Sequence, residues 1–321
     1  MTIHVISVGV SLLDGFLTTP WAYVRQRAEL GSLADAIASH TPGMLLARNA
    51  GDDSAAASAW LARCLGAEEA PGGAHPREHT ELAALTRAVT PAQWPAEVSP
   101  ELDTFARASG AHHLLSRDVA VLIATDTTAG LTAALWNAVA LAADDLTRVR
   151  YLAEPGALPA PNPRGGVLIV RVGGLDARNE QDFRTAMRGL GSLGRNLLEH
   201  VAETHEPFRF YLSGGFKAAI PYLIGLAEGL RSLPAVGPVD ALVLHETTKS
   251  GAIRLPLRRM TPDLIRAELS DFDPEGRRQT KPRGAFLEGY AYERDGEHWR
   301  LTAFGEGLRV LVGLASEGIG G

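Results

Sequence analysis

Five short apolar runs constrain the fold of this chain more than any other feature. They lack the alternation of apolar and polar residues that a half-exposed strand shows, and are typical of strands buried on both faces of a parallel sheet. Helix-length segments separate most of them, and this order predicts a doubly wound α/β sheet. The runs span residues 3–9, 119–125, 166–172, 208–214 and 241–246.

The segments between these runs divide into helices and loops. Alanine-rich, amphipathic helices are expected within 23–65 and 78–117, and a further helix over 129–143. The Ala/Gly/Pro-rich stretch 66–76 predicts a surface loop, and the proline cluster that ends 145–165 predicts a loop there as well.

The pattern changes after Pro256. Residues 261–272 (TPDLIRAELSDF) predict a capped helix, 276–284 a basic loop, and 290–305 a hairpin with its turn at Asp295-Gly296. We read this order as helix, helix, hairpin and expect a small winged-helix-like domain over 259–321, after a larger domain over 1–258. Acidic residues interleave the arginines of this tail, which disfavours nucleic-acid binding by it.

Composition limits the classes of function. A single cysteine, Cys64, excludes a disulfide framework and a multi-cysteine metal site, and we expect it to fill space on a helix. No apolar run reaches the roughly 18 residues of a membrane-spanning helix, and there is no charged-then-apolar leader. The net charge of −6 gives no electrostatic footprint for a protein that binds duplex DNA in general. We therefore expect a cytoplasmic protein that does not contact a membrane and needs no metal or other cofactor.

Small and polar residues follow three of the apolar runs. Ser11 comes soon after Gly9, where it either faces a ligand or caps the next helix. Asp126 and Thr127 follow the second run, where they either hydrogen-bond a ribose or cap the helix 129–143. In parallel sheets, ligands lie beyond the carboxyl ends of the strands, so all of these residues are candidates for a binding site.

The stretch SGGFK, residues 213–217, gives the clearest signal of a ligand. Its two glycines permit a close approach of the backbone to a phosphate. Lys217 stands at the start of a predicted helix, where its charge opposes the helix dipole unless an anion offsets it. The stretch therefore predicts an anion site.

Other motif matches are rejected. Residues 189–194 spell G-x-G-x-x-G but follow a helix-like run rather than a strand, so they do not predict a dinucleotide site. Two R-x4-H matches, at 107–112 and 195–200, are too easily met by chance to indicate a nuclease. The histidines are too scattered to predict a metal site.

Taken together, the strand ends resemble those of the CRISPR-associated Rossmann fold (CARF) family, and most closely the ring nucleases with a winged-helix tail. The resemblance covers 1–258, although the long insert 41–116 has no counterpart that we can assign. It implies a Rossmann-like domain in a homodimer that binds cyclic oligoadenylate, often cyclic tetra-adenylate, across the two-fold axis. The strings that carry it are VGVSLL (8–13), ATDT with Gly130, Gly174-Leu175 with Phe183, LSGGFK (212–217) with Pro221-Tyr222, and His245-Glu246 with Leu255-Pro256.

By this resemblance, Ser11 and Lys217 are the catalytic residues of a metal-independent ring nuclease that ends type III CRISPR antiviral signalling. Two alternatives remain: a binding-only sensor that regulates transcription or a partner through its tail, and a messenger-activated ribonuclease, which the short tail disfavours. The ligand-binding residues that we expect are Gly9, Val10, Ser11, Leu12, Asp126, Thr127, Ser213, Gly214, Gly215, Phe216 and Lys217.

Overall fold

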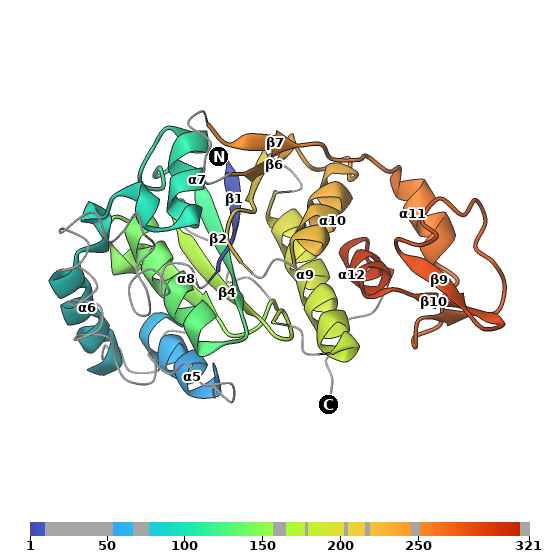
Figure 1. Cartoon of the computed structure of the whole chain (residues 1–321), viewed down its shortest axis with the longest axis horizontal. Coiled ribbons are helices and arrows are strands. Elements are labelled where there is room, and N and C mark those ends of the chain that lie inside the picture. The colour runs from blue at the N-terminus through green and yellow to red at the C-terminus, as the bar shows by residue number, and fades with distance from the viewer. Residues whose placement is uncertain are drawn as a thin grey trace.

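A seven-stranded sheet lies at the centre of the molecule, in the strand order β3-β4-β2-β1-β5-β6-β7 (Figure 1). The computed structural model describes residues 1–9, 54–66, 77–156, 165–176, 179–201, 205–215, 219–244 and 251–314. Strands β1 to β6 are parallel, and β7 runs antiparallel to β6 at one edge. The strands are β1 (Ile3–Ser7), β2 (Val119–Thr125), β3 (Val149–Leu152), β4 (Val167–Val172), β5 (Phe208–Tyr211), β6 (Val239–Val243) and β7 (Ile253–Leu255).

The central strands are buried on both faces, as the apolar runs predict. Every residue of β1 and of β2 is buried. Alternate residues of β2 pack into different cores: Leu122 on one side of the sheet, and Val121 and Ile123 on the other. The doubly wound, mainly parallel α/β architecture is therefore confirmed.

One face of the sheet carries the helices α5 (Ser54–Leu65), α7 (Pro100–Ser109) and α8 (Thr128–Leu141), with α6 (Arg77–Val89) outside them against α5 (Figure 1). Helix α8 is buried almost throughout because it lies between the sheet and α5. Cys64 of α5 is buried among these apolar side chains. The helices expected within 78–117 and 129–143 are thus present, as is the last part of those expected within 23–65.

The opposite face carries α9 (Glu180–Val201) and α10 (Ile220–Arg231). The sequence G-x-G-x-x-G lies inside α9, so it does not follow a strand. Two of its glycines allow close helix packing. A Cβ on Gly191 would collide with the carbonyl oxygen of Gly307, and a Cβ on Gly194 would lie 2.8 Å from Leu311. Rejection of the motif as a dinucleotide site was therefore correct.

The tail consists of α11 (Pro262–Leu269), a small antiparallel sheet and α12 (Ala303–Leu311). The sheet has the order β8-β10-β9, with β8 at Arg277–Arg278, β9 at Tyr292–Asp295 and β10 at His298–Leu301. The hairpin is confirmed, but its two turn residues are Gly296 and Glu297, one position later than predicted. Among residues 251–314, however, one helix precedes this hairpin and the second follows it, so our predicted order of helix, helix, hairpin was wrong. The winged-helix-like assignment of the tail is not confirmed.

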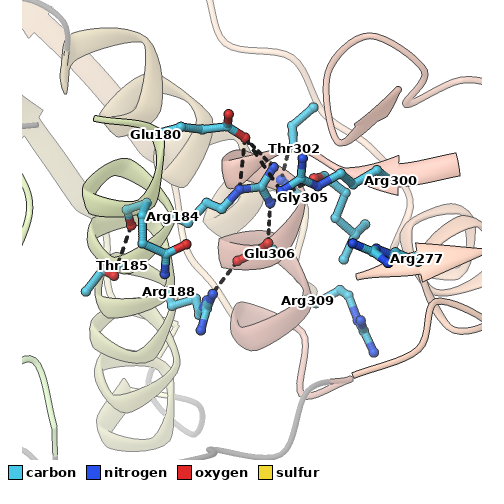
Figure 2. A network of polar contacts seen from close by, with 12 residues as sticks. Glu180, Arg184, Thr185, Arg188, Arg277, Arg300, Thr302, Gly305, Glu306 and Arg309 are labelled. Atoms are coloured by element: carbon cyan, nitrogen blue, oxygen red, sulfur yellow. Dashed lines mark hydrogen bonds and ion pairs between the residues drawn. The ribbon is translucent and has the colours of Figure 1, made fainter. Parts of the chain in front are cut away.

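Helix α12 is packed against α9 and α10 and shares their apolar core. Ion pairs at one end fasten it to α9 (Figure 2). The carboxylate of Glu306 accepts hydrogen bonds from the buried Arg184 and, at 2.7 Å, from Arg188. Arg184 also bonds Glu180 at 2.7 Å. The predicted boundary after residue 258 stays a prediction, but the last helix of the tail shares its core with the first domain.

Strand β3 corrects one further prediction. We expected 145–165 to be a loop, yet Val149–Leu152 pairs in parallel with β4. Only Val149 and Tyr151 of this strand are buried, because it lies at the edge of the sheet. A four-residue strand with two partly exposed positions gives a weak signal, and the proline cluster downstream obscures it.

Candidate functional site

The strand order predicts a ligand site between the carboxyl ends of β1 and β5, and we call this place the crevice. From β1 the chain moves outward to β2, β3 and β4 on one side of the sheet, and then returns to β5 on the other side. Strands β1 and β5 are therefore the pair at which the winding reverses. Such a reversal leaves a crevice beyond the carboxyl ends of the strands, where α/β proteins bind ligands.

Glycines from both strand ends meet at this crevice. A Cβ on Gly9 would lie 2.5 Å from the backbone nitrogen of Gly215, which is closer than a real Cβ approaches. Gly215 has a φ of 97°, a backbone conformation that favours glycine. A Cβ added to it would collide with the hydroxyl of Ser7. The two loops thus require glycine in order to touch each other, whether or not a ligand is bound.

The carboxyl group of Glu101 fills the space beside these glycines. Its Oε1 accepts a 2.7 Å hydrogen bond from the backbone N–H of Gly9. The same oxygen lies against the Cα of Gly214, where a Cβ would collide with it. Only 2% of Glu101 is exposed, and burial raises the pKa of its carboxyl group. A residue from the 41–116 insert therefore occupies the crevice.

Local capping explains how Glu101 reaches this position. Helix α7 starts with Ser99 as N-cap, whose hydroxyl accepts the N–H of Leu102 at 3.0 Å and donates to Asn137 of α8 at 2.7 Å. Pro100 follows in the first turn, where a proline suits a helix. Glu101 is next in the chain, so the start of α7 points its side chain at the ends of β1 and β5.

Ser213 has an internal role. Its hydroxyl oxygen accepts hydrogen bonds from the hydroxyl of Thr104 at 2.6 Å and from the backbone N–H of Leu244 at 2.7 Å. These bonds tie the end of β5 to α7 and to the end of β6. The role that we expected for Ser213 in ligand binding stays a prediction, and in the structure its hydroxyl is held by these two internal bonds.

Asp126 and Thr127 follow the neighbouring strand, β2. Asp126 Oδ1 accepts hydrogen bonds from Arg171 of β4 and from the hydroxyl of Ser54, both at 2.7 Å. Burial alone lowers the pKa of Arg171, but the bond to Asp126 outweighs it and holds that pKa above its usual range. Thr127 caps α8 by accepting the N–H of Gly130 at 3.0 Å. Of the two roles considered for Thr127, the structure shows capping.

The structure therefore brings part of the predicted site together. Gly9, Gly214 and Gly215 meet at the crevice, while Ser213 lies behind them and Asp126 bonds to the next strand along. Sequence analysis missed Glu101 and Thr104, which come from the insert. The predicted residues that lie outside the described part of the chain are Val10, Ser11, Leu12, Phe216 and Lys217.

Within the described ranges, no group of three or more His, Cys, Asp or Glu side chains could hold a metal ion. None of the helices in this part of the chain has the length and apolar character needed to cross a membrane. Comparison with known proteins adds no assignment, because no protein-family model matches the chain and no curated protein does so either.

Proposed function

We propose that this chain is a ring nuclease-like CARF protein that binds cyclic oligoadenylate, with cyclic tetra-adenylate as the expected ligand, and cleaves it without a metal ion. The observation that carries the proposal is the pairing of two glycine-bearing strand ends at the crevice where the sheet reverses its winding. A phosphate can approach the backbone closely at such a place.

The proposed reaction uses a nucleophile that belongs to the ligand. A ribose 2′-hydroxyl gives up its proton as its oxygen forms a bond to the adjacent phosphorus, the bond from phosphorus to the 5′-oxygen breaks, and the 5′-oxygen takes up a proton. The product is a linear oligoadenylate with a 2′,3′-cyclic phosphate. In this scheme Ser11 orients the ribose and Lys217 stabilises the charge that develops on the phosphate, so catalysis depends on positioning and electrostatics.

The proposal includes a homodimer. A cyclic ligand with two-fold symmetry is best bound by a symmetric site to which each chain contributes the same residues. Light scattering with ligand present should therefore give twice the mass of the chain. A monomer at micromolar concentration would contradict this part of the proposal.

A second candidate function is a sensor that binds the ligand and signals through its tail. It is favoured by the packing of α12 on α9 and α10, because α10 begins a few residues after Gly215. Two basic residues of the tail are paired internally, Arg278 with Asp271 at 3.1 Å and Lys281 with Glu288 at 3.0 Å. In such a sensor a protein partner is therefore a better target than DNA.

One experiment separates the two functions. Purified protein is incubated in EDTA with labelled cyclic tetra-adenylate, with its 2′-O-methyl analogue, and with linear RNA and DNA. A ring nuclease binds both cyclic compounds, converts only the first to a product with a 2′,3′-cyclic phosphate, and leaves linear RNA and DNA intact. A sensor binds both and cleaves neither. If neither cyclic compound binds, the proposed function is wrong.

A further inference from the structure

The two oxygens of the Glu101 carboxyl group have different surroundings. Oε1 is held by the Gly9 N–H at 2.7 Å, whereas Oε2 is buried and has no hydrogen-bond partner among the described residues. Most buried polar atoms have a partner, and an orphaned one needs an explanation. The orphaned oxygen belongs to a side chain that lies against Gly214 at the candidate site. It thus leaves one unused hydrogen-bonding position beside the two strand ends.

Two other buried glutamates of this chain show what a purely structural role looks like. Glu228 is 3% exposed, and its carboxylate bonds Arg258 through both oxygens and also accepts the hydroxyl of Tyr290 at 2.7 Å. Glu268 is 1% exposed and accepts hydrogen bonds at both of its oxygens. Glu101 is as buried as these two but lacks a partner at one oxygen.

The surroundings of Glu101 favour its neutral form. Burial raises its pKa and prevails over the hydrogen bond from the Gly9 N–H, which lowers it. Among the described residues, no cation contributes to this pKa. The charged groups on the elements packed against α7 are Glu97 of η2 (Ala96–Val98), Arg209 of β5 and Asp240 of β6, and α7 itself carries the paired Asp103 and Arg107.

We propose that Glu101 is a ligand-binding acid of this crevice, whose Oε2 carries a proton that is donated in a hydrogen bond to a phosphate oxygen of the ligand. The inference rests on the proposed function, because it takes a phosphodiester as the ligand. Gly9 holds Oε1, so the hydroxyl at Oε2 is presented in a fixed direction. A neutral acid also avoids the repulsion that a buried carboxylate exerts on an anion.

The proposal makes binding depend on pH with a defined sign. Ligand binding retains the proton, so affinity is full where Glu101 is protonated in the free protein. Affinity falls as the pH rises above the pKa of Glu101, with a limiting slope of about tenfold per pH unit. A phosphodiester keeps a single charge throughout this range, so the slope does not come from the phosphates.

The test measures the affinity for 2′-O-methyl cyclic tetra-adenylate by calorimetry from about pH 5.5 to about pH 8.5, a range that starts above the usual pKa of Glu. Three proteins are compared: the parent, Glu101→Gln and the control Asp103→Asn. Gln keeps an acceptor for Gly9 and a donor in place of the Oε2 proton at every pH. Asp103→Asn removes one negative charge from the same helix without touching the crevice.

We expect the parent and Asp103→Asn to lose affinity once the pH rises above the pKa of Glu101, by up to about tenfold per pH unit, and Glu101→Gln to keep its affinity. Infrared spectroscopy of the parent should also show a protonated carboxyl band that Glu101→Gln lacks. This second measurement tests the proposal on the parent if Glu101→Gln folds poorly.

Two results would overturn the inference while leaving the proposed function intact. One is a parent whose affinity for the analogue is independent of pH and whose infrared spectrum lacks the protonated carboxyl band of Glu101. The other is a Glu101→Gln variant whose affinity follows the same slope as the parent. If the parent does not bind the analogue at any pH, the proposed function fails and the role of Glu101 fails with it.

Discussion

Two regions of the molecule contain close glycine packing and glutamates with little exposure: the crevice between β1 and β5, and the interface of α12 with α9 and α10. They differ in how completely their polar groups are paired. At the α12 interface, both oxygens of Glu306 accept hydrogen bonds from arginines of α9 (Figure 2). Glu228, beneath the start of the tail, is paired as fully. At the crevice, one oxygen of Glu101 has no partner in the part of the chain that the structure describes.

This difference separates a structural interface from a candidate binding site. At Glu228, burial raises the pKa, but the bonds from Arg258 and Tyr290 outweigh it and leave that pKa below its usual range. At Glu101, burial prevails and the pKa is raised. Burial alone therefore does not indicate function. An incomplete set of partners beside a strand end is the more informative sign.

The largest expected effect falls on the tail. Glu268→Ala removes the acceptor for the backbone N–H groups of Phe286 and Leu287 and for the hydroxyl of Tyr292. We expect the free energy of unfolding to fall by about 3–5 kcal/mol, because several buried donors lose their partner. Urea denaturation measures this loss. Affinity for cyclic tetra-adenylate should change by no more than about twofold. Loss of a charged hydrogen bond to the ligand would cause a much larger change.

Glu288→Ala is the matched control for this variant. Glu288 is a half-exposed acid of the same tail, paired with Lys281 at 3.0 Å. Loss of such a pair should cost no more than about 1 kcal/mol. If Glu268→Ala keeps its stability and loses ligand affinity, the tail contributes to the binding site and is not purely structural.

The next effect concerns the opposite end of β1. His4 is buried beside Tyr211 and Asp118, and burial lowers its pKa to about 4. The unfolded chain binds a proton more readily than the folded protein, so His4 contributes stability that is lost as the pH falls from about 6.5 towards 4, worth about 3 kcal/mol. NMR titration of the ring should show a pKa well below the usual value. A pKa near 6.5 would contradict this account.

Glu101 should act in the opposite sense. Its raised pKa makes the folded protein bind the proton more readily, so its contribution to stability is complete at acidic pH and is lost as the pH rises through the raised pKa. His4, near one end of β1, thus stabilises the fold when it is neutral. Glu101 of α7, which packs at the other end of β1, also stabilises the fold when it is neutral.

A smaller effect is expected at Lys217. Lys217→Ala should weaken the binding of cyclic tetra-adenylate by about one to two decades, the equivalent of a charge-assisted hydrogen bond of roughly 1.5–3 kcal/mol. Stability should change little, because we place the lysine at a ligand site. Calorimetry and thermal unfolding measure the two quantities. A strongly lowered melting temperature would mean that the lysine is structural.

The smallest effect concerns the rate of cleavage. Ser11→Ala should bind cyclic tetra-adenylate nearly as well as the parent and cleave it at least about tenfold more slowly, about 1.4 kcal/mol in the barrier. The expected cause is lost alignment of the 2′-oxygen with phosphorus. Single-turnover assays measure the rate. Equal losses of affinity and rate would assign Ser11 to binding instead of alignment.

The sequence was sufficient to predict the central sheet, since strands buried on both faces leave long apolar runs. Residues 119–125 form β2 as predicted. The sequence was insufficient to predict β3 at the edge of the sheet, because alternate residues of this strand are exposed. It was also insufficient in the tail, where the short strand β8 precedes the hairpin and the second helix, α12, follows it. Tertiary pairing decides such short elements more than local pattern does.

The site was predictable only in part. The glycines after β1 and β5 could be found because small residues at strand ends are a local signal. Glu101 could not, because Ser99-Pro100-Glu101 has the pattern of an ordinary helix start, in which an acidic residue in the first turn is expected on the surface. Its burial depends on the packing of α7 beside β5 and β6. Glu101 also lies more than 90 residues from Gly9 in the chain, so no local pattern links the two.

A structure of the protein with 2′-O-methyl cyclic tetra-adenylate tests the central claim most directly. The account predicts a ligand at the crevice between β1 and β5, with phosphate oxygens within hydrogen-bond distance of the backbone at Gly214 or Gly215 and of Glu101 Oε2. A ligand bound at another surface, such as the tail or the α12 interface, would contradict it.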